Sequence, residues 1–337
     1  MVEIEFKIYH PCPSLSRRGV PTLPVGAGRL TIKNYMPQSI NLKSGSLSWG
    51  DASYVILTGA TAAGKSNLAI EMARQLPSEI ISADSRQVYI GMNIGTDTPP
   101  QSILDEIPHH FINELNPDVT WSAGEFYQEA RNRIRQILVK GKLPIVVGGS
   151  SLYLDALQFG FFENNSKDAI IREKYEALFR DGKAEEYWNR LNKLDPDYAQ
   201  RFHYHDEKKL MRAFEIIETT GLTPSQVFDE SQDTFEHTGY RVIVERSRPK
   251  LYEIINTRVL EMINKGLVDE CKDLLEKGFS PTLYPMRTIG YKEVYQYLDN
   301  EISKDRMIEL IQQHSRNFAK RQLTWFRNHP RDFTIEL

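Results

Sequence analysis

Residues 54–66 have the sequence YVILTGATAAGKS, and this stretch decides the fold class. Its first four residues, 54–57, form a short apolar run of strand-forming side chains, which predicts a buried β-strand. The next segment matches the pattern G-x-x-x-x-G-K-[ST] at Gly59, Ala60, Thr61, Ala62, Ala63, Gly64, Lys65 and Ser66. Helical spacing follows over Asn67–Gln75. A strand, a glycine loop and a helix in this order predict a phosphate-binding P-loop, and they disfavour a chance match.

The predicted loop has a clear chemical purpose. Its glycines allow backbone N–H groups to turn inward around phosphate oxygens, and the helix N-terminus adds partial positive charge. We expect Lys65 to neutralise phosphate charge and the Ser66 hydroxyl to ligate Mg²⁺, the predicted cofactor. The loop indicates a phosphate ligand but does not identify the reaction.

The rest of the chain extends this unit into an α/β fold. Further strands are predicted at Glu79–Ala83, Pro144–Val147 and Tyr240–Val244, and Gly124–Lys140 has the spacing of a helix. Strands that alternate with helices predict a P-loop NTPase-like parallel sheet flanked by helices. We assign residues 53–162 and 236–337 to this catalytic core, and residues 249–328 should be helical.

Two segments differ from the core in composition. Residues 1–52 are rich in proline and glycine without sustained periodicity, which predicts a poorly ordered extension without function. Residues 163–235 are charged and aromatic, with short helices expected at Glu186–Leu194, Glu207–Thr219 and Pro224–Glu230. They predict an inserted all-helical domain.

The bulk properties limit the class of protein. With 40% hydrophobic and 26% charged residues, the chain has the composition of a globular protein. Its net charge of -3 gives no overall sign of a nucleic-acid binder, so RNA binding would require basic residues gathered on one face. Cys12 and Cys271 provide neither a disulfide framework nor zinc spacing, and no apolar run approaches the ~20 residues of a membrane span. These features predict a cytoplasmic protein without membrane association, by default a monomer.

One acidic residue separates the possible reactions. The strand that ends at Val147 continues into Gly148-Gly149, without the carboxylate that a P-loop ATPase carries there for its metal. The strand Glu79–Ala83 instead ends directly at Asp84. Ligands of open α/β sheets bind at the carboxyl ends of the strands, so Asp84 is predicted to be a metal carboxylate or a general base. The alternative is a capping or turn residue at a strand exit.

Several spaced blocks then resemble a known family. They are DSRQVY at 84–89, GMNIGT at 91–96, His109-His110, VGGSSLY at 147–153, RTIGYKE at 287–293 and RNFAKRQLTWFR at 316–327. In this order the blocks resemble the tRNA dimethylallyltransferases, the isopentenylpyrophosphate transferase family, over about residues 53–330. The P-loop departs from that family's GPTASGKT at Ala60, Ala63 and Ser66, and Ser150 stands where the family usually has threonine. Both serines keep a hydroxyl group.

The resemblance implies a reaction. The family transfers the dimethylallyl group of dimethylallyl diphosphate to N6 of adenosine 37, beside the anticodon, in tRNAs that read codons beginning with U. The P-loop would then hold the diphosphate rather than ATP. Lys65, Ser66-bound Mg²⁺ and Arg287 would stabilise the leaving diphosphate, and Asp84 would accept the N6 proton.

The resemblance also implies contacts with the tRNA anticodon stem-loop, whose target nucleotide must leave its stack. The expected tRNA-binding residues are Asp84, Ser85, Arg86, Gln87 and Ser150 in the core, and Arg172, Lys208, Lys209, Leu210, Met211 and Arg212 in the insertion. The Gln87 amide is suited to an adenine edge. Without the resemblance, the basic residues of the insertion would be interpreted as a solvated helix face. The cations and aromatic residues of 316–327 either line the tRNA channel or pack the last helix.

Three alternatives stay open at this point. A P-loop small-molecule kinase would consume ATP. An adenylate isopentenyltransferase would use the same chemistry on AMP, ADP or ATP, but it would not need a basic helical insertion. A non-catalytic RNA-binding protein is disfavoured because Lys65, Ser66 and Asp84 are all present.

Overall fold

The computed structural model describes residues 5–7, 52–160, 169–200, 202–230, 235–327, 329 and 331–337. The chain divides into two compact units: unit 1 comprises Met1–Leu154 and Phe235–Leu337, and unit 2 comprises Asp155–Thr234. The sequence had placed these divisions at residues 162/163 and 235/236. The predicted extension 1–52 lies outside the described residues, apart from Glu5–Lys7 and Ala52.

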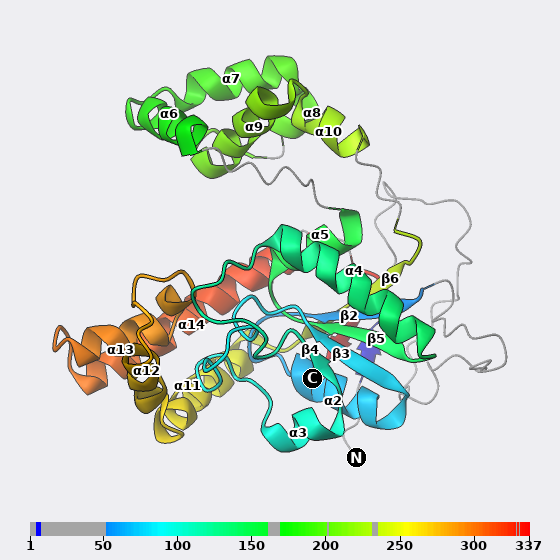
Figure 1. The fold of residues 1–337 in the computed structure, drawn as a ribbon, viewed down its shortest axis with the longest axis vertical. Coiled ribbons are helices and arrows are strands. Elements are labelled where there is room, and N and C mark those ends of the chain that lie inside the picture. Colours follow the sequence, from blue (N-terminus) through cyan, green and yellow to red (C-terminus); the bar gives the residue numbers. More distant parts are fainter. Residues whose placement is uncertain are drawn as a thin grey trace. The chain divides into compact units, whose positions relative to one another are not determined.

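Unit 1 is built on a seven-stranded sheet with the order β1-β7-β6-β2-β5-β3-β4 (Figure 1). The strands are β1 (Glu5–Lys7), β2 (Tyr54–Thr58), β3 (Ser78–Ser82), β4 (His109–His110), β5 (Leu143–Val147), β6 (Gly239–Glu245) and β7 (Phe333–Glu336). Strands β2 to β7 are parallel to one another, and β1 pairs antiparallel with β7. The predicted parallel α/β sheet is therefore confirmed.

Helices cover both faces of this sheet. Those of unit 1 are α2 (Lys65–Gln75), α3 (Gln101–Glu106), α4 (Ala123–Val139), α11 (Arg248–Asn264), α12 (Leu267–Glu276), α13 (Tyr291–Leu298) and α14 (Lys304–Arg327), with a 3₁₀ turn η2 at Pro285–Arg287. Helix α5 (Ser151–Phe159) begins in unit 1 and crosses into unit 2. Helices α2 and α4 lie on opposite sides of the sheet (Figure 1). Within the described residues, no helix combines the length and apolar character of a membrane span.

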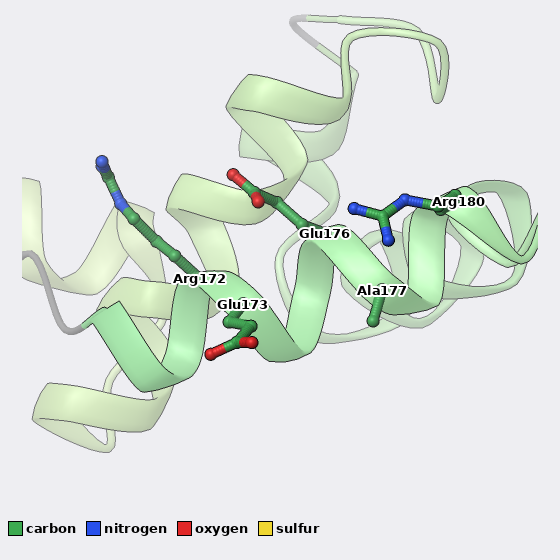
Figure 2. A pocket seen from close by; sticks show the side chains of 5 residues that line it. All are labelled: Arg172, Glu173, Glu176, Ala177 and Arg180. Carbon is green, nitrogen blue, oxygen red and sulfur yellow. The ribbon is translucent and has the colours of Figure 1, made fainter.

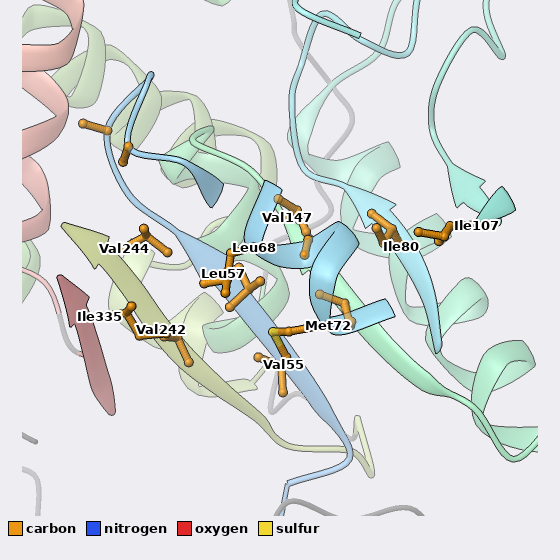
Figure 3. Packing of buried hydrophobic residues seen from close by; sticks show 14 of the residues in the cluster. Val55, Leu57, Leu68, Met72, Ile80, Ile107, Val147, Val242, Val244 and Ile335 are labelled. Atoms are coloured by element: carbon orange, nitrogen blue, oxygen red, sulfur yellow. The ribbon is translucent and has the colours of Figure 1, made fainter. Parts of the chain in front are cut away.

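The alternation of side chains along β2 explains why helices are needed on both faces. All five residues of β2 are buried, as expected for a strand in the middle of a parallel sheet. Figure 3 shows a core against this sheet, in which Val55 and Leu57 of β2 pack with Leu68 and Met72 of α2 and Val242 of β6. This packing holds the P-loop, which joins β2 to α2, between two buried elements.

The buried carboxylate of Glu79 on β3 binds three basic side chains near the β4 edge of the sheet. His110 of β4 lies 2.9 Å from it, and the Nζ atoms of Lys140 and Lys142 donate hydrogen bonds to it at 3.0 Å. Burial favours a higher pKa for Glu79, but the hydrogen bonds from His110, Lys142 and Lys140 outweigh it and lower the pKa to about 2. The histidine pair 109–110 thus forms β4, and His110 contacts Glu79.

The described part of unit 2 is helical. After α5 its helices are α6 (Ala169–Arg180), α7 (Ala184–Leu194), α8 (Pro196–Ala199), α9 (Glu207–Thr220) and α10 (Pro224–Glu230). They enclose a core of their own, which includes Tyr175, Leu191, Leu210 and Phe214. Helix α6 has no counterpart among the predicted helices.

Candidate active site

The P-loop has the backbone geometry of an anion site. Gly59 has a φ of 147°, and a Cβ atom there would lie 2.2 Å from the carbonyl oxygen of Val244. Gly64, with a φ of 100°, precedes α2 and provides no side-chain cap. The first N–H groups of α2 therefore receive no hydrogen-bond acceptor from a capping side chain, which leaves this helix terminus suited to a phosphate. Both glycines are required by their conformation or by close packing.

Lys65 is half-buried inside the loop. Its Nζ donates a hydrogen bond to the carbonyl oxygen of Ala60 at 2.8 Å. Burial, followed by the charge of Arg258, lowers the pKa of Lys65 to about 8, although Asp84 and Asp97 act in the opposite direction. Positive charge is thus concentrated here at some energetic cost, which a bound anion would relieve. Ser66, the predicted Mg²⁺ ligand, is exposed beside Lys65.

Arg258 of α11 is a functional candidate that the sequence analysis missed. Its Nη2 donates to the Thr61 hydroxyl at 3.0 Å, and its Nη1 lies 3.1 Å from Asp97 Oδ2. Arg258 is adjacent to Val259, one of the buried residues of α11. An arginine at the edge of the apolar face of this helix was therefore the one feature of the sequence that could have identified Arg258.

Arg287 is the residue that the family resemblance implies for stabilising the leaving diphosphate. It ends the turn η2, it is exposed, and in the described part of the chain it makes no hydrogen bond or ion pair with the P-loop. The neighbouring Thr288 is the residue of this motif that reaches the site, because its hydroxyl accepts a hydrogen bond from Arg86 Nε at 2.5 Å.

Asp84 follows β3 at the carboxyl edge of the sheet. Its Oδ1 accepts a hydrogen bond from the Arg86 backbone N–H at 2.9 Å, so this carboxylate does stabilise a turn. Among the described residues, no hydrogen bond engages Oδ2. The charge of Asp84 acts on the pKa of Lys65, which brings the candidate base and the phosphate-binding lysine into one electrostatic environment. A turn role and a base role are compatible, since each uses a different oxygen.

The residues after Asp84 are held by other parts of unit 1. The Ser85 N–H donates to the Ser150 hydroxyl at 3.2 Å, and the Arg86 guanidinium lies 4.3 Å from the centre of the Tyr284 ring. The Gln87 amide accepts from the Ser82 hydroxyl at 2.7 Å and donates to the Thr96 carbonyl at 3.2 Å. Gln87 therefore stabilises the loop that contains Thr96. Its amide would have to give up these hydrogen bonds before it could bind an adenine edge.

The predicted tRNA-binding residues of unit 2 fall into two groups. Arg172 and Arg212 both pair with Glu215, whose side chain is fully buried, and Leu210 is part of the core of unit 2. Lys208 and Lys209 are exposed on α9, and Met211 is half-buried. A cavity of about 480 Å³ lies on α6 and is lined by Arg172, Glu173, Glu176, Ala177 and Arg180; Figure 2 shows these five side chains. Its lining mixes both signs of charge, so the two exposed lysines are the better candidates for phosphate contacts.

Comparisons with known proteins agree with one another. The family model described as IPP transferase matches residues 87–329. The tRNA dimethylallyltransferases of Chlorobium phaeobacteroides and Oceanobacillus iheyensis are 42% and 38% identical to this chain; each match covers 81% of this chain and 87% or 88% of the relative.

Solved structures show the same relationship. The tRNA isopentenylpyrophosphate transferase of Bacillus halodurans is 34% identical with a TM-score of 0.60, and the match covers 84% of this chain and 89% of that one. A eukaryotic dimethylallyltransferase described as acting on tRNA is 29% identical with a TM-score of 0.65, over 81% of this chain and 69% of that one. The protein therefore belongs to the IPP transferase family.

Proposed function

We propose that this protein is a tRNA dimethylallyltransferase, which transfers the dimethylallyl group from dimethylallyl diphosphate to N6 of adenosine 37 and releases diphosphate. The observation that carries the proposal is the arrangement at the carboxyl edge of the sheet. Lys65 and Arg258 provide a cationic site for a leaving diphosphate, and the carboxylate of Asp84 lies in the same electrostatic environment. Membership of the family supports this assignment of roles.

The proposed chemistry divides between these groups. The bond between C1 of the prenyl group and the diphosphate oxygen breaks, and its electron pair leaves with the diphosphate. Backbone N–H groups of the P-loop, Lys65 and Arg258 stabilise the charge that develops there. The nitrogen lone pair of N6 forms the new bond to C1, and Asp84 accepts the N6 proton. An exocyclic amine is a weak nucleophile, so accurate positioning contributes as much as basicity.

The residues at the loop fit the Mg²⁺ that the family resemblance implies. Ser66 is exposed in the first turn of α2, next to Lys65. The carboxylates of Asp84 and Asp97 both act on the pKa of Lys65. The described residues contain no cluster of three or more His, Cys, Asp or Glu for a metal. This suits Mg²⁺, which usually keeps several waters and takes few protein ligands in addition to substrate phosphates. The ion would supply charge neutralisation of the diphosphate.

We assign the tRNA contacts to both units. Asp84, Ser85, Arg86 and Ser150 border the proposed reaction centre in unit 1. In unit 2 we assign phosphate contacts to the exposed Lys208 and Lys209, and Lys209 would exchange its ion pair with Asp206, at 3.0 Å, for such a contact. Action as a cytoplasmic monomer stays a prediction from the sequence.

A labelling experiment tests the function. Purified protein is incubated with labelled dimethylallyl diphosphate, Mg²⁺, and either unmodified tRNA or AMP. We expect label in tRNA only, and a tRNA with guanosine at position 37 should stay unlabelled. Label in AMP would instead identify an adenylate isopentenyltransferase. Hydrolysis of ATP without transfer of label would identify a kinase or ATPase.

A further inference from the structure

Gln322 of α14 is a buried polar residue with two backbone partners in separate loops. Its Oε1 accepts a hydrogen bond from the Thr61 N–H of the P-loop at 2.8 Å. Its Nε2 donates to the carbonyl oxygen of Gly149, in the turn after β5, at 3.0 Å. Only 8% of Gln322 is exposed, and it lies between the buried Ala319 and Phe326 on the inward face of α14. A buried amide on such a face is tolerated because both of its polar atoms are satisfied.

The turn that Gln322 contacts is itself joined to the loop that carries Asp84. Strand β5 lies between β2 and β3 in the sheet, so its exit turn lies between the P-loop and Asp84. Ser150 in this turn accepts the hydrogen bond from the Ser85 N–H, and a Cβ atom on Gly148 would lie 2.2 Å from the carbonyl oxygen of Ala83. A continuous series of contacts therefore leads from the P-loop through Gln322 and Ser150 to the backbone next to Asp84.

Gly149 fits against the Gln322 amide so closely that it has no room for a side chain. A Cβ atom at this position would lie 2.6 Å from Nε2 of Gln322, which is shorter than a non-bonded contact allows, whereas the carbonyl oxygen of Gly59, the next nearest atom, would be 3.5 Å away. The glycine is thus needed for the contact with Gln322. Alanine at this position would displace the amide from the turn.

We propose that Gln322 is a positioning residue for prenyl transfer, which fixes the diphosphate-binding loop at a set distance from the turn that orients Asp84. The inference rests on the proposed function. In a displacement reaction the attacking N6 and the leaving diphosphate must be aligned across the prenyl carbon while the base lies within reach of the N6 proton, and small misplacements are costly. Gln322 touches the two loops but not the reacting atoms, so its loss should slow transfer more than it weakens binding of the diphosphate.

The test uses the full chain and four variants. Gln322→Met keeps the length of the side chain and removes both hydrogen bonds, and Gly149→Ala breaks the same contact from the other side. The third variant combines them. The matched control is Gln312→Met on the same helix, where the lost bond is that of Nε2 to the Asn256 carbonyl at 3.2 Å, outside the P-loop. Transfer to tRNA gives kcat and KM, and binding of inorganic diphosphate is measured by calorimetry.

We expect Gln322→Met and Gly149→Ala each to lower kcat roughly 10- to 100-fold, while KM for dimethylallyl diphosphate and affinity for inorganic diphosphate change less than about 3-fold. The double variant should be no more than about 3-fold slower than the slower single variant, because both substitutions break one contact. Gln312→Met should stay within about 2-fold of the wild type. If Gln322→Met does not fold, Gly149→Ala, which retains Gln322 and adds one methyl group, decides the question.

Besides a normal kcat in Gln322→Met, three results would overturn the inference: kcat unchanged in Gly149→Ala, a loss confined to diphosphate binding, or losses that multiply in the double variant. The wild type is assayed first. A wild type that transfers no label to tRNA defeats the proposed function, whereas an active wild type with a normal kcat in Gln322→Met defeats this inference alone.

Discussion

At the residue scale, Asp84 offers a substitution that separates its two roles. Asp84→Asn keeps Oδ1 as an acceptor for the Arg86 N–H and removes the negative charge. We expect transfer to fall by about 10²- to 10⁴-fold, because a neutral amide cannot take the N6 proton. Binding of tRNA should be nearly unchanged. Single-turnover transfer and filter binding measure the two, and Asp118→Asn, an exposed position on the same unit, is the control. Full turnover in Asp84→Asn would remove Asp84 from the mechanism.

Arg258 and Lys65 give a pH-dependent prediction at the same scale. The pKa of Lys65 is about 8 because of burial and the Arg258 charge, so diphosphate affinity should decline as pH rises through about 8 and Lys65 loses its proton. Arg258→Met should weaken binding by roughly 10- to 100-fold, since a charge-assisted contact is lost. Without the neighbouring positive charge the pKa of Lys65 rises, so the decline should move to higher pH.

Calorimetry with inorganic diphosphate between pH 6.5 and 9.5 measures both effects. Arg287→Met is the comparison variant. A loss of affinity as large as that of Arg258→Met would return the leaving-group role to Arg287, in agreement with the sequence-based assignment and against the geometry.

The residues of the site differ in how well the sequence identified them. Lys65, Ser66 and Asp84 were recognisable because each directly follows a predicted strand or glycine loop, so chain order alone brings them to the carboxyl edge of the sheet. Arg258 and Gln322 follow Thr61 in the chain by 197 and 261 residues. Their side chains contact Thr61 only once the chain has folded. A local sequence pattern cannot predict contacts between residues so far apart in the chain.

At the scale of elements, the strands that the sequence predicts are those with a local pattern, and a strand without one is missed. Strands β2, β3, β5 and β6 are all predicted because continuous apolar or β-branched runs are typical of buried parallel strands. Strand β4 has two residues, both histidines, and is too short to show any period. Its pairing with β3 is supported by the contact of His110 with Glu79, a tertiary feature that hydrophobic patterning does not report.

The Glu79 cluster predicts how this edge of the sheet responds to acid. Its folded pKa of about 2 lies below the value of 4.5 for a free glutamate, so the cluster contributes stability above pH 4.5 and loses it as pH falls toward 2. Glu79→Gln should lower the free energy of unfolding by about 2–3 kcal/mol at pH 7, and the difference should shrink at pH 3. Urea unfolding at both pH values measures this, with the exposed Glu129→Gln as control. An equal deficit at pH 7 and pH 3 would contradict the ionic origin.

The basic residues of unit 2 have two different predicted roles. Lys208→Met with Lys209→Met should weaken tRNA binding and reduce the salt dependence of log affinity by up to about 2 units of slope, because two exposed phosphate contacts are lost. Arg172→Met should instead lower the thermal stability of unit 2, since the buried carboxylate of Glu215 would keep Arg212 as its one ionic partner among the described residues. Affinity measured from 50 to 300 mM salt, together with thermal unfolding, separates the two. A salt slope unaltered in the lysine variant would exclude phosphate contacts there.

At the scale of the whole molecule, the two units have separate hydrophobic cores, and this should separate their functions. Phe214 is buried in unit 2, with its ring stacked 5.1 Å from that of Tyr175. Phe214→Ala should cost unit 2 about 3–4 kcal/mol. Because the P-loop, Arg258 and Gln322 all belong to unit 1, binding of inorganic diphosphate should survive while tRNA binding is lost. Ile255→Ala, in the core behind the P-loop, should weaken both. Calorimetry and filter binding on the same preparations measure the contrast, and loss of diphosphate binding in Phe214→Ala would mean that the P-loop depends on unit 2 for its structure.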